Sequence, residues 1–270
     1  MRFFLVFGIA LGYASAASPQ PDATEIVRRS VQRIEADWKQ APEYSFVEHD
    51  IESKHHSPPT VKTYQVLMID GSPYNRLIAI NDHPLSTAEQ QEEENKLRAE
   101  VLKRGRESER ERRRRIAKYL KERQQDHEMF KQMVEAFDFR PDGEANVNGH
   151  HCWVFDAEPK PGYQPTSRET KVLAGMKGKL WIDKRQYQWV RVEAEVIRPV
   201  SLYGIFAKVG PGTHIFLEQA PVGDNLWLPA RLSVNVKASA LGFINEDSLD
   251  DETYRQYKPM PNTAGLEAHK

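Results

Sequence analysis

The feature that most constrains the fold of this 270-residue chain is a strict two-residue alternation of apolar and polar side chains in its C-terminal half. In segment 190–196, valine or alanine occupies every even position and arginine or glutamate every odd position. Segment 231–238 repeats the alternation with other residues. Because successive side chains of a strand point to opposite faces, both segments predict strands of an antiparallel sheet with one apolar and one solvated face.

Further stretches predict strands that extend this sheet. They are 44–53, 62–69, 74–81, 150–158, 178–183, 188–200, 204–209, 214–220, 226–240 and 252–257. A sheet this wide must curl or split, and its apolar face must be covered. An amphipathic helix is predicted at 24–40. We therefore expect an α+β fold, in which a large curved antiparallel sheet forms an unclosed half-barrel with helices over its concave face.

A half-barrel of this kind often keeps an apolar cavity, which gives the concave face a candidate role in ligand binding. The residues assigned to that surface are Leu180, Ile182, Val190, Val192, Val196, Leu217, Leu232, Val234 and Val236.

A long charged insertion, residues 86–137, interrupts the strand pattern. Ser86 and Glu89 have the spacing of a capping box, which predicts a helix start. As one helix, the insertion would extend ~78 Å at 1.5 Å per residue, so we expect a hairpin that breaks near Gly105 or one protruding arm. The run Arg112, Arg113, Arg114 and Arg115 is a candidate contact for lipid headgroups or an acidic partner. A solvated helix explains the same run and is the favoured interpretation.

The N-terminus predicts export. One positive charge precedes an apolar run at 3–11, and small residues follow at 14–16, as in a cleavable signal peptide over residues 1–16. The apolar run is about half of the ~20 residues that a membrane span needs. We expect a periplasmic or secreted protein with a single domain at 17–258 and a disordered tail at 259–270.

The sequence offers no catalytic site. Cys152 is the single cysteine, which excludes internal disulfides, and the pairs His55-His56 and His150-His151 point to opposite faces if they lie on strands. No nucleophile elbow, zinc-protease or phosphate-loop motif occurs. The balance of 38 basic and 39 acidic residues does not favour nucleic acid as a partner. We therefore expect a non-enzymatic protein without metal or cofactor.

Three strand motifs resemble those of the LolA/LolB superfamily of lipoprotein carriers. They are Gly178-Lys179-Leu180-Trp181-Ile182-Asp183, the following strand from Gln188 to Glu193, and Leu226-Trp227-Leu228-Pro229. The resemblance covers most of 24–258 and implies an unclosed barrel with a helical lid over a cavity that receives acyl chains. It implies a lipid, acyl chain or lipoprotein as partner, with at most peripheral membrane contact. The charged insertion departs from that pattern, which leaves open the alternative of a cell-envelope scaffold whose helical arm contacts a protein partner.

Overall fold

The computed structural model describes residues 22–54, 57–167, 169–201, 207–223, 225–240, 244–245 and 247–260. The predicted signal peptide and residues 261–270 of the predicted tail lie outside these ranges. Within them, no helix combines the length and the apolar character needed to cross a membrane.

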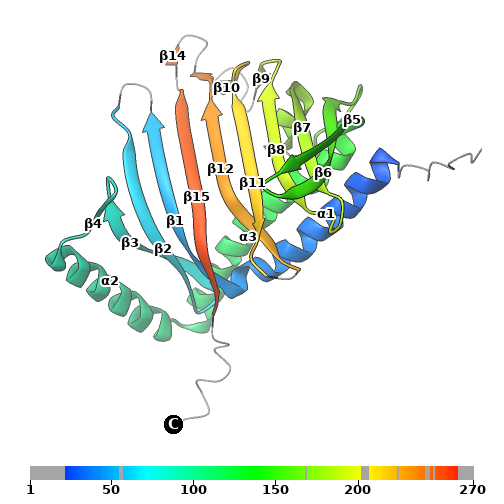
Figure 1. Ribbon diagram of the computed structural model, residues 1–270. Helices are drawn as coiled ribbons and strands as arrows, with labels where there is room; N and C mark the ends of the chain where they lie inside the picture. The colour runs from blue at the N-terminus through cyan, green and yellow to red at the C-terminus, as the bar shows by residue number, and fades with distance from the viewer. Residues whose placement is uncertain are drawn as a thin grey trace, which may run out of the picture.

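An eleven-stranded antiparallel sheet dominates the fold, in the order β4-β3-β2-β1-β15-β12-β11-β8-β7-β6-β5. The strands at the two ends of this order, β4 and β5, do not pair with each other. The sheet is therefore an unclosed half-barrel, as predicted (Figure 1). Its strands are β1 (Tyr44–Lys54), β2 (Thr60–Ile69), β3 (Ser72–Ile80), β4 (His83–Pro84), β5 (Phe137–Val147), β6 (His150–Pro159), β7 (Met176–Asp183), β8 (Trp189–Val196), β11 (His214–Pro221), β12 (Trp227–Val236) and β15 (Ser248–Pro259). The short strands β9 (Val200–Ser201), β10 (Ala207–Val209), β13 (Ala238–Ala240) and β14 (Ile244–Asn245) form a second sheet.

Two helices cover one face of the large sheet, which we call the inner face (Figure 1). Helix α1 (Ala23–Gln40) buries Ile26, Val27 and Ile34 against a core that includes Ile182 and Trp189. Helix α3 (Glu109–Ala136) crosses the same face and contacts α1 and the 3-10 helix η2 (Glu169–Gly175). A second 3-10 turn, η1 (Ala41–Glu43), leads from α1 into β1. The main core therefore lies between these helices and the inner face.

The charged insertion breaks where the sequence predicted. Helix α2 (Thr87–Gly105) ends at Gly105, and Ser108 starts α3 with a second capping box. The insertion is neither a paired hairpin nor a protruding arm, because α2 lies against β3 and α3 continues across the sheet from the break (Figure 1). We call the bend between these helices, residues 105–109, the elbow.

The strand prediction missed one strand and misplaced several boundaries. Strand β5 was not predicted, because Pro141, Asp142 and Gly143 obscure its alternation; they lie in an irregularity of the pairing with β6. Strand β15 extends to Pro259, which pairs with Tyr44, so residue 259 belongs to the sheet and not to the predicted tail.

Candidate functional site

A cavity of about 380 Å³ lies between α3, η2 and the inner face of the sheet. Its walls are almost entirely apolar. The helices and β5 contribute Met129, Phe130, Met133, Phe137, Phe139, Val172 and Leu173, and the other strands contribute Ala157, Met176, Gly178, Leu180, Trp189, Val192, Ala194, Ile215, Leu217, Pro229, Leu232 and Tyr254. Three charged residues of β7 and β8, Lys177, Lys179 and Glu193, also border it. This volume lies within the range of about 300–1,000 Å³ that is common for small-molecule pockets.

The cavity exists because small residues meet on neighbouring strands. Gly178 of β7 pairs with Ala157 of β6 on one side and with Ala194 of β8 on the other. A Cβ atom at position 178 would lie 2.7 Å from the Glu193 carbonyl oxygen, so the backbones approach too closely for a side chain there. This row of small residues forms the floor of the cavity.

The opposite wall is deformable. Met129 and Met133 extend into it from α3. Methionine side chains are unbranched and fill irregular spaces, so they adapt to ligands of different shape. Phe130 is held more firmly, since its ring meets Trp189 edge to face with 5.6 Å between centroids.

The structure separates the nine residues that the sequence assigned to the concave surface. Leu180, Val192, Leu217 and Leu232 line the cavity. Ile182 and Val196 are buried on the inner face beside it. Val234 and Val236 are half-buried on β12 and lie outside the cavity lining.

The assignment of Val190 to the concave face is wrong. Ile182 pairs with Trp189, whereas the preceding Trp181 pairs with Arg191, so Val190 is an extra residue at a bulge. The bulge places Trp189 among the inner-face residues and Val190 in a separate cluster with Cys152 and Trp227. Alternation alone gave no sign of this register change.

Carboxyl groups of β1 and β15 lie beside the cavity on the inner face. Glu252 of β15 pairs with the cavity residue Leu232 on one side and with Asp50 of β1 on the other. The next inner-face pairs add Asp250 and Glu48, and we call the four residues the acidic group. Tyr254, which lines the cavity, donates its hydroxyl to Glu252.

Glu48, Asp50 and Glu252 of the acidic group hold protons more tightly than isolated carboxyls do. Burial, followed by repulsion from Glu48, raises the pKa of Glu252 to about 7. Burial and the neighbouring Asp250 raise the pKa of Asp50, and burial raises that of Glu48. Oxygens of Asp50, Asp250 and Glu252 lie within 4.8 Å of one another. Among the described residues, these three form the set whose spacing would suit a hard cation.

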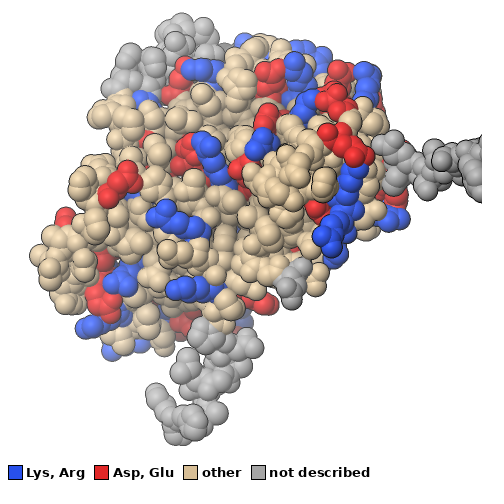
Figure 2. Space-filling view, viewed as in Figure 1, with Lys and Arg blue, Asp and Glu red and all other residues tan. Residues whose placement is uncertain are grey.

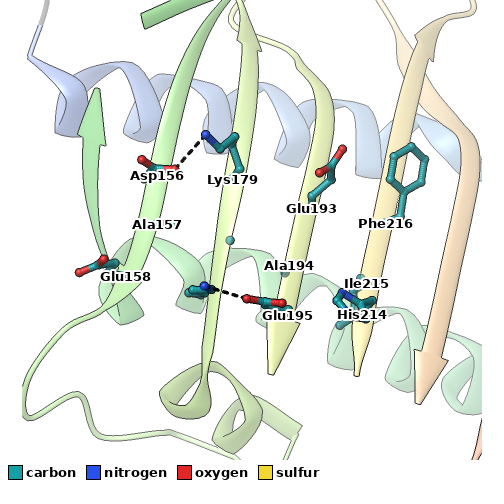
Figure 3. A pocket seen from close by; sticks show the side chains of 12 residues that line it. Asp156, Ala157, Glu158, Lys179, Glu193, Ala194, Glu195, His214, Ile215 and Phe216 are labelled. Atoms are coloured by element: carbon teal, nitrogen blue, oxygen red, sulfur yellow. Dashed lines mark ion pairs between the residues drawn. The ribbon is translucent and has the colours of Figure 1, made fainter. Parts of the chain in front are cut away.

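The outer face of the sheet carries paired charges (Figure 3). Lys179 forms an ion pair with Asp156 at 3.1 Å, and Lys177 forms one with Glu195 at 2.8 Å. Across the whole visible face, positive and negative side chains are interspersed (Figure 2). Because exposed pairs of this kind are common on solvated sheets, we assign no ligand to this face.

The arginine run does not act as one surface. Arg115 points inward: it donates to Glu107 at 2.6 Å and to the Ser72 hydroxyl at 2.7 Å in the turn between β2 and β3. The guanidinium of Arg115 is thus engaged within the fold, which does not favour its predicted role as a partner contact. Arg112, Arg113 and Arg114 are exposed on α3.

Cys152 is buried, and burial raises the pKa of its thiol to about 11. A thiol with so high a pKa is a poor nucleophile at neutral pH, which agrees with the prediction that Cys152 is a packing residue.

Comparison with known proteins gives a likeness of fold. No family model matches the chain, and no curated protein matches it. Among solved structures, the fold is similar to that of a LolA superfamily protein from Nitrosomonas europaea, at 9% identity and a TM-score of 0.32 over 90% of this chain and 96% of that one. It is also similar to a DUF1329 family protein from Desulfovibrio piger, at 11% identity and a TM-score of 0.33 over 91% and 96%. At such identities the likeness assigns no function.

Proposed function

We propose that this protein is a non-enzymatic carrier that binds an acyl chain, or another long apolar group of a lipid or lipoprotein, in the cavity beneath α3. The observation that supports the proposal is the apolar cavity of about 380 Å³ with its floor of small residues. The predicted signal peptide supports a place of action outside the cytoplasm, in the periplasm or beyond.

The size of the cavity limits the ligand. Its volume equals that of roughly a dozen water molecules at about 30 Å³ each, and a methylene group has a similar volume. Burial of about 0.8 kcal/mol per methylene would give a chain of roughly ten carbons about 8 kcal/mol before the cost of association. An alkyl chain of this length therefore has enough apolar surface for useful affinity.

The charges beside the cavity limit the orientation of the ligand. The acidic group lies next to Tyr254 and Leu232, so an anionic headgroup would be repelled at that end. We expect the polar end of an anionic ligand to leave the cavity on the side of η2, where Val172 and Leu173 form the wall.

Filling the cavity tests the proposal. Ala194→Phe places an aromatic ring on the floor, and Met129→Trp enlarges the opposite wall. We expect the purified protein to bind 11-(dansylamino)undecanoic acid saturably, and each variant to bind it at least about tenfold more weakly because ring and ligand compete for one volume. The measurement is the fluorescence of the dansyl group during titration.

Ala79→Phe is the matched control, since it makes the same change on β3 of the same sheet but outside the cavity. It should bind the probe as the unmodified protein does. Absence of saturable binding by the unmodified protein, or equal affinity in all three variants, would exclude the cavity as a ligand site.

A further inference from the structure

The elbow carries basic side chains that the fold leaves without acidic partners. Arg106, Arg110, Arg112 and Arg114 are exposed, and among the described residues none of the four forms an ion pair. We call these four residues the elbow arginines. Their neighbour Arg113 pairs with Glu109 at 2.8 Å, with both side chains largely exposed. The elbow and the start of α3, residues 106–115, therefore carry an excess of positive charge, with six arginines against Glu107, Glu109 and Glu111.

Inward-pointing arginines hold this surface in place. Arg104 is buried and donates to the carbonyl oxygens of Ile69 at 2.7 Å and Ser72 at 2.8 Å, in the β2–β3 turn. Arg115 donates to the hydroxyl of the same serine. Arg104 and Arg115 thus fix the elbow to the sheet, while the elbow arginines take no part in these contacts.

Large apolar side chains are exposed beside the elbow arginines. Leu102 is 59% exposed on α2, four residues before Arg106, and Leu120 is 52% exposed on α3. Arg110, Arg114 and Lys121 share one stripe of α3 at spacings of four and seven residues, and Leu120 flanks that stripe. This mixture of basic stripe and exposed leucine is typical of helices that lie in a membrane interface.

We propose that the elbow binds the surface of an anionic lipid bilayer, with the elbow arginines on the headgroups and Leu102 and Leu120 in the boundary layer. An acidic protein would satisfy the arginines too, but the exposed leucines favour a bilayer. The proposal goes beyond ligand binding in the cavity. The two surfaces are connected, since α3 runs from the elbow to Met129 and Met133 in the cavity wall.

Vesicle co-sedimentation tests the proposal with the full chain. The probes are vesicles of phosphatidylglycerol and phosphatidylethanolamine, and vesicles of phosphatidylcholine alone. We expect binding to the anionic vesicles that weakens as salt rises, and little binding to the neutral ones. The variant R106Q/R110Q/R112Q/R114Q should lower the partition coefficient by about tenfold or more, because each basic residue near the bilayer adds to the electrostatic attraction to anionic headgroups. Leu102→Ser with Leu120→Ser should reduce the binding that remains at high salt.

The control removes the same number of charges elsewhere, at the exposed Lys171, Arg185, Arg255 and Lys258, none of which forms an ion pair among the described residues. It should sediment like the unmodified protein if position matters, and equal losses in the two charge variants would overturn the proposal. Absence of vesicle binding together with capture by immobilised poly-glutamate would overturn it in favour of an acidic protein. The dansyl titration is independent of these outcomes, so failure at the elbow is distinguishable from failure of the cavity proposal.

Discussion

Carboxyl groups of β1 and β15 occupy the inner face beside an apolar cavity, where water is partly excluded. Glu252 lies between the cavity and the other carboxyl groups, since its cross-strand neighbours are the cavity residue Leu232 and Asp50. Burial and the negative charges around it favour its protonated form. The free energy of unfolding should therefore decrease as the pH rises.

Replacing Glu252 by glutamine should flatten the pH dependence of stability. With a folded-state pKa of about 7, the folded protein keeps a proton that an unfolded glutamate releases above pH ~4.5. Stability should therefore fall as pH rises from about 4.5 to about 7, and then level off. Because the carboxyl is only partly buried, solvent screening reduces the effect to about 1–2 kcal/mol. Thermal unfolding between pH 5 and pH 8 measures it.

Glu193→Gln, on the outer face, is the control and should leave that dependence unchanged. Glu252→Gln should unfold at a higher temperature than the unmodified protein at pH 8 and at a similar temperature at pH 5. Parallel curves for Glu252→Gln and the unmodified protein would show that Glu252 titrates normally in the folded state.

At the scale of elements, the placement of α2 depends on a buried arginine. Arg104 is 7% exposed, pairs with Glu100 at 2.7 Å, and donates to backbone carbonyls of the β2–β3 turn. Apolar packing contributes little to holding α2 on the sheet, because Arg104 is its buried residue and most of its other side chains are exposed. Polar contacts, chiefly those of Arg104 with the ion pair of Arg76 and Glu94 at 3.2 Å beside them, thus replace the apolar stripe that usually holds a helix on a sheet.

Arg104→Ala should therefore destabilise the protein by about 3–5 kcal/mol, since Glu100 and the turn carbonyls lose a buried partner. Arg106→Ala, two residues away and exposed, should cost about 0.5 kcal/mol or less. Urea unfolding gives both values, and limited proteolysis should cleave α2 first in Arg104→Ala. Equal midpoints in urea would show that the helix is held by other contacts.

For the whole molecule, cavity volume should set the dependence of affinity on ligand length. In a series of n-alkyl alcohols, whose headgroup is uncharged, each added methylene should lower the Kd about fourfold while it enters the cavity. The gain should stop near a dozen carbons, when about 380 Å³ is filled. Calorimetry or displacement of the dansyl probe measures the series.

A continued gain well beyond that length would mean that the chain lies in an open groove instead. Affinity that is independent of length would mean that the alkyl group is not buried. In Ala194→Phe, the plateau should move to shorter alcohols, which distinguishes a smaller cavity from a general loss of structure.

The sequence by itself determined the features that depend on near neighbours along the chain. Period-two alternation in 190–196 and 231–238 predicted an antiparallel sheet with one apolar face. The capping residue Ser86 and the break near Gly105 followed from local backbone chemistry in the same way. Because each of these signals involves residues within a few positions of one another, no tertiary contact was needed to interpret them.

Only the tertiary structure decided which residues meet. The floor of the cavity joins Ala157, Gly178 and Ala194 from three strands, and the acidic group joins strands about 200 residues apart. The bulge at Val190 reversed a face assignment because register depends on the partner strand, not on the strand's own alternation. Likewise, Arg114 and Arg115 are adjacent in sequence and differ in role, since the β2–β3 turn lies within reach of one guanidinium and not of the other.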